Sequence, residues 1–186
     1  KMEPKPAIAE SWDASADLKT WTFKLKRGAE FHNGETIDAE AVKWNIERIK
    51  DPKKSHAFTR SVVSGVERVT VDDKYTVRFH LKEPDVALDI NLIYYPVNLM
   101  APGAADKADT EPVNCGPFKF KSWRRLDRCE LVRFENFYET DAEGNSLPYL
   151  DGLIGLPKKE DRVRLTALRA NELDLIDNVA YSDAAA

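Results

Sequence analysis

Residues 21–42, WTFKLKRGAEFHNGETIDAEAV, contain the succession of elements that decides the fold. Hydrophobic residues alternate with polar ones at its start: Trp21, Phe23 and Leu25. This alternation predicts a strand with one buried face. The pair Asn33-Gly34 predicts a tight turn, and Asp38 stands where a helix N-cap is expected, before a helix over residues 39–50. The stretch therefore predicts strand, turn and capped helix, and it holds no catalytic motif.

Hairpins dominate the chain on either side of this stretch. Paired hydrophobic runs joined by turn residues predict three of them: residues 11–14 with 20–26, residues 66–71 with 75–81, and residues 118–123 with 128–134. Further elements are expected as helices over residues 86–95 and 158–170, a last strand over 173–176, and a frayed end at 183–186. Interleaved strands and helices of this kind predict a mixed α/β (α+β) fold instead of a doubly wound parallel sheet.

Composition limits the classes of protein that the chain can belong to. It has 186 residues, of which 42% are hydrophobic, which suits one domain or two small lobes. The net charge of -4 argues against a nucleic-acid partner, because such surfaces need a basic field. No apolar run reaches the roughly 20 residues that span a bilayer as a helix.

Six segments, in a fixed order along the chain, resemble the family 5 extracellular solute-binding proteins of ABC importers, which include the oligopeptide- and dipeptide-binding proteins. The first two are PAIAESW at residues 6–12, similar to the family's "PALAESW", and the stretch at 21–42. The other four are VRFHLKEP at 77–84, NCGPFKF at 114–120, PYLDG at 148–152 and LRANELDLI at 168–176. They resemble the family's "LKEP", "GTGPYKF", "PYLDG" and "LQAGEVDLI". Each segment alone is weak, and the six together are specific.

The resemblance implies a lobe of the type II periplasmic-binding-protein kind, with a mixed sheet, hairpins and flanking helices. Its parts would be residues 1–37 and 113–186 as the ligand-facing subdomain and residues 38–112 as an inserted smaller one. Because the family's chains are much longer, the sequence is expected to be an internal fragment without the second lobe. No signal segment is visible in it.

The function that the resemblance implies is transport. The protein would be periplasmic or extracellular, bind a small solute, most commonly a peptide, and deliver it to the transmembrane subunits of an ABC permease. Because the family's peptide contacts lie largely in the second lobe, this chain alone is expected to bind weakly. The alternative is a sensing or interaction module that uses the same binding fold.

Four residues are candidates for ligand contact: Asn114, Cys115, Gly116 and Trp44. The resemblance places Cys115 where the family has threonine between two glycines. The backbone there could line the cleft between the lobes, or the segment could be a tight link in which cysteine fills a small buried site. Trp44 falls off the apolar stripe of its helix and could be partly exposed.

Catalytic and metal motifs are weak. The three histidines, His32, His56 and His80, are not at zinc-ligand spacing, and no glycine-rich phosphate loop is present, so no cofactor is predicted. His32 is expected to be a turn residue that hydrogen-bonds nearby backbone. The hairpin register puts Cys115 roughly 23 Å from Cys129, beyond the roughly 7 Å that a disulfide allows, so two free thiols are predicted. A nucleophilic Cys115 has no sequence-adjacent histidine to activate it, and the protein is not expected to be an enzyme.

Overall fold

The computed structural model describes residues 4–179, and the contacts between them divide the chain into two compact units. The first unit is Lys1–Phe120 with Val132–Asp151, and the second is Lys121–Leu131 with Gly152–Ala186.

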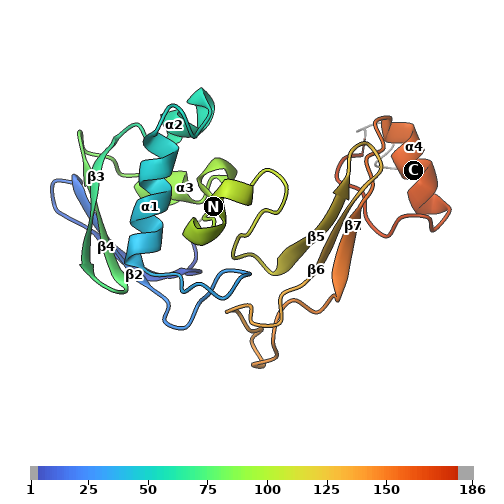
Figure 1. Cartoon of the computed structure of the whole chain (residues 1–186), viewed down its shortest axis with the longest axis horizontal. Helices are drawn as coiled ribbons and strands as arrows, with labels where there is room; N and C mark the ends of the chain where they lie inside the picture. The colour runs from blue at the N-terminus through green and yellow to red at the C-terminus, as the bar shows by residue number, and fades with distance from the viewer. Residues whose placement is uncertain (1–3, 180–186) are drawn as a thin grey trace. The chain divides into compact units, whose positions relative to one another are not determined.

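A four-stranded sheet forms the framework of the first unit (Figure 1). Its strands are β1 (Ala9–Ala14), β2 (Thr20–Leu25), β3 (Val66–Asp73) and β4 (Thr76–Leu81), in the order β1-β2-β4-β3. The first two predicted hairpins are present, as β1 with β2 and β3 with β4. Strand β2 also pairs with β4, so that Trp21 lies opposite Phe79. The mixed α/β class is confirmed, with one correction. The sheets are antiparallel instead of mixed, because hairpins supply most of the strand connections.

Helix α1 (Ala39–Lys50) packs against β3 and β4 and has the predicted bounds. Asp38 Oδ1 accepts a hydrogen bond from the Ala41 N–H at 2.9 Å, which confirms the predicted N-cap. The apolar stripe of α1 is buried in the main core: Val42, Ile46 and Ile49. Strand residues complete that core, among them Trp21, Phe23, Val69, Val77 and Phe79.

A smaller hydrophobic cluster lies next to the main core. It buries Ala29, Phe31, Ile37, Ala41 and Ala101, and partly buried Val113, Cys115 and Tyr138 pack against it. Segments far apart in the sequence therefore meet at Phe31, whose side chain is 0% exposed.

Short helices complete the first unit: α2 (Ala57–Val62), α3 (Leu88–Leu92) and the 3-10 helices η1 (Tyr95–Val97) and η2 (Pro102–Lys107). The helix predicted over residues 86–95 is thus only five residues long. Tyr94, the N-cap of η1, is extended, with ψ at 133°, and this separates α3 from η1. A proline cannot donate to the helix ladder, and this limits α3.

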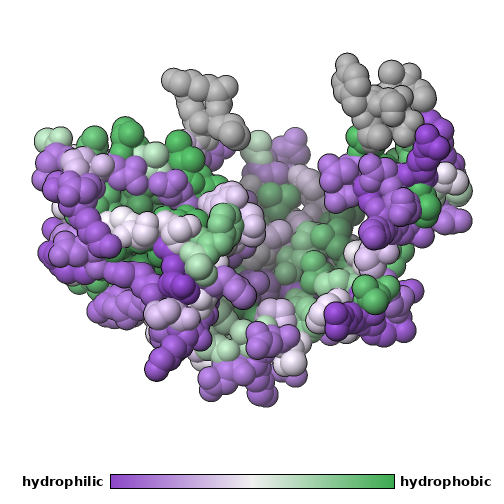
Figure 2. Space-filling model, turned by 90° about the horizontal axis from the view of Figure 1, so that it is seen from above, coloured by the Kyte–Doolittle hydropathy of each residue, from purple (hydrophilic) through white to green (hydrophobic). Residues whose placement is uncertain are grey.

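Exposed hydrophobic side chains of the first unit gather around α2, α3 and η1: Phe58, Val86, Ile90, Ile93, Tyr94 and Tyr95. The ring of Tyr94 contacts those of Phe58 and Tyr95, with centroids 6.0 and 5.0 Å away. Figure 2 shows hydrophobic residues (green) exposed among the hydrophilic ones (purple) that cover much of the surface in that view.

The second sheet has the order β5-β6-β7, with β5 (Phe118–Arg124), β6 (Arg128–Arg133) and β7 (Gly152–Gly155). The third predicted hairpin is therefore present. Helix α4 (Asp161–Arg169) follows and begins three residues later than the predicted helix over 158–170. Beyond its end, Asn171 has φ 57°, the left-handed conformation that asparagine tolerates after a helix.

The strand predicted over residues 173–176 is wrong. Leu175 is 84% exposed, and no strand within the described residues pairs with this segment. A strand needs a neighbour for its backbone hydrogen bonds, and the alternation of hydrophobic residues alone does not supply one. The frayed end predicted at 183–186 lies outside the described residues.

The three-part division at residues 37 and 112 stays a prediction. In the structure, strands from residues 1–37 and 38–112 pair in one sheet. Within residues 4–179, no helix combines the length and the apolar character needed to cross a membrane.

Candidate ligand-binding pocket

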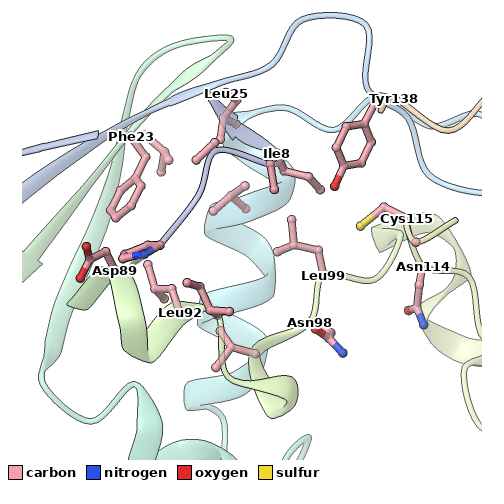
Figure 3. Close-up of a pocket in the computed structure, with 18 of the residues that line it drawn as sticks. Ile8, Phe23, Leu25, Asp89, Leu92, Asn98, Leu99, Asn114, Cys115 and Tyr138 are labelled. Atoms are coloured by element: carbon pink, nitrogen blue, oxygen red, sulfur yellow. The ribbon is translucent and has the colours of Figure 1, made fainter. Parts of the chain in front are cut away.

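A pocket of about 500 Å³ opens in the first unit, and its size is typical of small-molecule sites. Its apolar lining comes from the sheet, from α1 and from the segments around them: Ile8, Phe23, Val42, Ile46, Phe79, Leu92 and Leu99 among others. Polar groups also line it, among them Asp89, Asn98, Asn114, Cys115 and Tyr138, which are labelled in Figure 3. The lining therefore combines a mainly apolar surface with a few polar groups.

One wall of the pocket is formed by residues 114–117, which bring three of the four predicted ligand contacts together: Asn114, Cys115 and Gly116. Their role in binding stays a prediction. Trp44 does not line this pocket. It is half-buried on α1, and the guanidinium of Arg48 lies 5.8 Å from the centre of its ring, which gives Trp44 a structural partner.

His32 hydrogen-bonds this wall to the turn that follows β2. The turn is closed by a bridge between Glu30 and Thr36, and Gly34 has φ 85°, a conformation that glycine adopts without strain. From this turn the His32 N–H donates to the Asn114 carbonyl at 2.9 Å, and His32 Nε2 lies 2.8 Å from the Gly116 carbonyl. The prediction that His32 bonds nearby backbone is wrong, since its partners are more than 80 residues away.

The surroundings of the His32 ring favour its neutral form. Its Nδ1 is buried without a hydrogen-bond partner, and the edge of the ring meets Phe134, with centroids 5.0 Å apart. Burial lowers the pKa of His32 and Lys119 lowers it further, while the hydrogen bond to Gly116 opposes both. A carbonyl can only accept, so Nε2 carries the proton and donates it to Gly116.

We expect the stability of the protein to fall as the pH drops below about 6.5, the ordinary pKa of histidine. The unfolded chain then binds a proton at His32 that the folded chain excludes, and proton uptake favours the unfolded state. At higher pH, His32 is neutral in both the folded and the unfolded chain and adds no pH dependence to the stability. Urea unfolding between pH 4.5 and 8 measures it, and His32→Gln should flatten part of the slope. His80→Gln is the matched control for the other histidine of lowered pKa. Identical pH profiles for wild type and His32→Gln would contradict the prediction.

Cys115 lies at the same wall, and its sulfur points toward Tyr138 (Figure 3). Burial raises the pKa of the Cys115 thiol to about 11. Burial, followed by the nearby Glu139 and Cys115, also raises the pKa of the Tyr138 hydroxyl. Both cysteines are free, as predicted. The raised pKa removes the thiolate that nucleophilic catalysis would need near neutral pH.

Cys115 should accordingly react slowly with iodoacetamide at pH 7. A pKa of about 11 in place of 9.0 lowers the thiolate fraction by about a hundredfold relative to an unperturbed thiol. Mass spectrometry of the labelled peptides measures the rate, with urea-unfolded protein as the reference. Labelling of Cys115 at the unfolded rate in folded protein would show that the thiol is neither buried nor shifted.

Within the described residues, no group of three or more His, Cys, Asp or Glu side chains converges.

Comparison with known proteins identifies the family of the chain. The profile of the bacterial extracellular solute-binding proteins, family 5 Middle, matches residues 3–186. The chain belongs to this family. A relative within it is the glutathione-binding protein GsiB of Escherichia coli O1:K1, which is 30% identical over 190 residues, covering 100% of this chain and 36% of its own length.

Solved structures of periplasmic binding proteins share the fold. AgaA from A. tumefaciens R10, in complex with agropinic acid, is 34% identical with a TM-score of 0.85, covering 97% of this chain and 36% of its own. DppA from Helicobacter pylori, in complex with the peptide STSA, is 26% identical with a TM-score of 0.75, covering 91% and 37%. This family 5 chain therefore spans little more than a third of the length of these relatives.

Proposed function

We propose that this family 5 chain is part of the extracytoplasmic solute-binding component of an ABC importer that takes up small peptides. It would work in the periplasm or outside the cell and deliver its solute to the transmembrane subunits of a permease. The observation that carries the proposal is the match to the family profile over residues 3–186. The pocket supports it, because its apolar lining and few polar groups suit an amphiphilic solute.

Peptides are favoured among the solutes of the relatives. One relative is a glutathione-binding protein, and one similar structure holds a bound peptide. Another similar structure holds agropinic acid, so a small non-peptide acid is the nearest competing ligand.

A binding role without catalysis is the second part of the proposal. The Cys115 thiol is the one nucleophile that the sequence suggested near the pocket, and its raised pKa keeps it protonated near neutral pH. Binding would instead rest on closure of two lobes around the solute, as in other periplasmic binding proteins. Since this chain spans 36% of its relative, we expect it to supply only part of the contacts and to bind weakly alone.

A thermal-shift panel tests the proposal on the product of the complete gene and, beside it, on the 186-residue chain. The panel holds di- to tetrapeptides, oligosaccharides, agropinic acid and nickel chelates. A ligand at 100 times its dissociation constant stabilises its target by about 2.7 kcal/mol. Peptides should shift the complete protein and leave the 186-residue chain almost unchanged. A shift by another class alone would overturn the peptide assignment, and no shift by any class would remove the transport proposal in favour of a partner-binding role.

A further inference from the structure

The wall of the pocket has an uneven distribution of hydrogen bonds. Three of its carbonyl oxygens, those of Asn114, Gly116 and Pro117, accept bonds of 2.8–2.9 Å from the rest of the first unit, as does the carbonyl of the preceding Val113. The donors come from three separate places in the chain, namely Ala101, His32 and Phe134. These bonds hold the backbone of the wall in one conformation.

The N–H groups of the same wall are not used. Those of Asn114, Cys115 and Gly116 donate to no residue in the described part of the chain, and Pro117 has no N–H. Cys115 and Gly116 are half-buried, where an N–H without an acceptor costs free energy. Residues 114–116, the donor segment, therefore line the pocket and carry three N–H groups that no described residue uses.

We infer that the donor segment binds an acceptor oxygen of the solute, an amide carbonyl or a carboxylate, while an apolar group of the same solute occupies the pocket. The inference rests on the proposed solute-binding function and adds the chemical class of the ligand. A carbonyl oxygen has two lone pairs and a carboxylate has about four acceptor sites, so one such group can accept from two or more of these adjacent N–H groups. The apolar lining formed by Phe23, Ile46 and Leu99 would bury the apolar group of the solute.

His32 is the positioning residue of this site. Its backbone N–H donates to the Asn114 carbonyl, and its Nε2–H donates to the Gly116 carbonyl. These two residues lie on either side of Cys115. A carbonyl that accepts a hydrogen bond from His32 is held in a fixed direction. It is also unavailable as an acceptor for donor groups of the solute. Loss of the ring would free the Gly116 carbonyl and let the donor segment rotate.

Two probes with the same apolar group separate this binding mode from simple burial. The first, 4-methylpentanamide, carries an acceptor oxygen, and the second, 4-methylpentan-1-amine, is an ammonium ion at pH 7 and has no acceptor. In ¹H–¹⁵N spectra of the 186-residue chain, the amide should move the resonances of Asn114, Cys115 and Gly116 downfield. The amine should leave them in place. No movement with the amide, or equal movement with both probes, would overturn the inference.

Variants of His32 test its positioning role with the same amide probe. We expect His32→Ala to weaken binding about tenfold, the equivalent of one hydrogen bond of about 1.4 kcal/mol. His32→Gln keeps a side-chain N–H donor and should restore binding to within about threefold. A purely structural role predicts equal losses in the two variants once their unfolding midpoints are matched, and that result would reject the positioning role. If His32→Ala does not fold, the comparison of His32→Gln with wild type and the two-probe spectra still decide the matter.

Failure of this inference differs from failure of the transport proposal. If peptides stabilise the complete protein while the amide probe leaves residues 114–116 unmoved, solute binding stands and the donor segment is rejected. If no solute stabilises the complete protein but the resonances move as expected, the donor segment stands as a binding site of another function.

Discussion

Phe31→Ala should lower the free energy of unfolding by about 3–5 kcal/mol, as expected for truncation of a fully buried aromatic residue. The ring is 0% exposed and is the largest member of the small cluster with Ala29, Ile37 and Ala101. The alanine and isoleucine side chains around it are too short to fill the space that it would leave. The cavity term therefore adds to the lost hydrophobic transfer energy.

The same substitution should also loosen the pocket wall. Val113, Cys115 and Tyr138 pack against the Phe31 cluster, and His32 follows it directly. Urea unfolding measures the loss, and Phe31→Leu is the matched control, since it keeps an apolar group and should cost about 1–2 kcal/mol. A loss below about 1 kcal/mol for Phe31→Ala would mean that the cluster collapses around the gap or contributes little.

Asn45→Leu should cost about 2–4 kcal/mol although it places an apolar residue of similar size in the core. Asn45 is 0% exposed, and its amide Nδ2 donates to the carbonyls of Ala41 and Met100 at 2.9 and 3.0 Å. Its Oδ1 accepts from the Met100 N–H at 3.1 Å. Leucine would leave both backbone groups of Met100 without this partner, and each such group costs about 1–3 kcal/mol when buried.

A control on the same helix separates this effect from helix propensity. Glu47 is exposed on α1, and Glu47→Leu should change stability by no more than about 0.5 kcal/mol. Equal small losses in both variants, measured by urea unfolding, would show that Met100 finds other partners. Asn45 holds both backbone groups of Met100, so Asn45→Leu should also speed amide exchange in residues 98–101. This segment includes Leu99, which lines the pocket.

Local signals in the sequence predicted most of the first unit. Helix α1 has its predicted bounds because Asp38 caps it and its apolar stripe has helical spacing. The hairpins follow from alternation and turn residues. The ligand contacts proposed at residues 114–116 came from resemblance to a family motif and stay a prediction. The sequence did not predict η1 or the short α3, where a proline limits the helix more than the apolar pattern suggests.

Contacts between distant segments could not be read from the sequence. The partner of His32 lies 84 residues away, and nothing near His32 in the chain indicates it. Asn45 left a signal that could have been used, since it is the polar residue between Val42 and Ile46 on a buried face. The strand wrongly predicted over residues 173–176 shows the same limit, because whether a strand forms depends on a neighbour elsewhere in the chain.

The pairing of β2 with β4 has a consequence for biosynthesis. Trp21 and Phe23 face their partners Phe79 and Val77 only after more than fifty further residues have been made. Until then, β1 and β2 form an isolated two-stranded hairpin, which is marginally stable in water. A nascent chain therefore leaves the ribosome with two large aromatic side chains uncovered, and contacts of such long separation form slowly. During that interval this hairpin is the segment at which a chaperone would bind or at which neighbouring chains would aggregate.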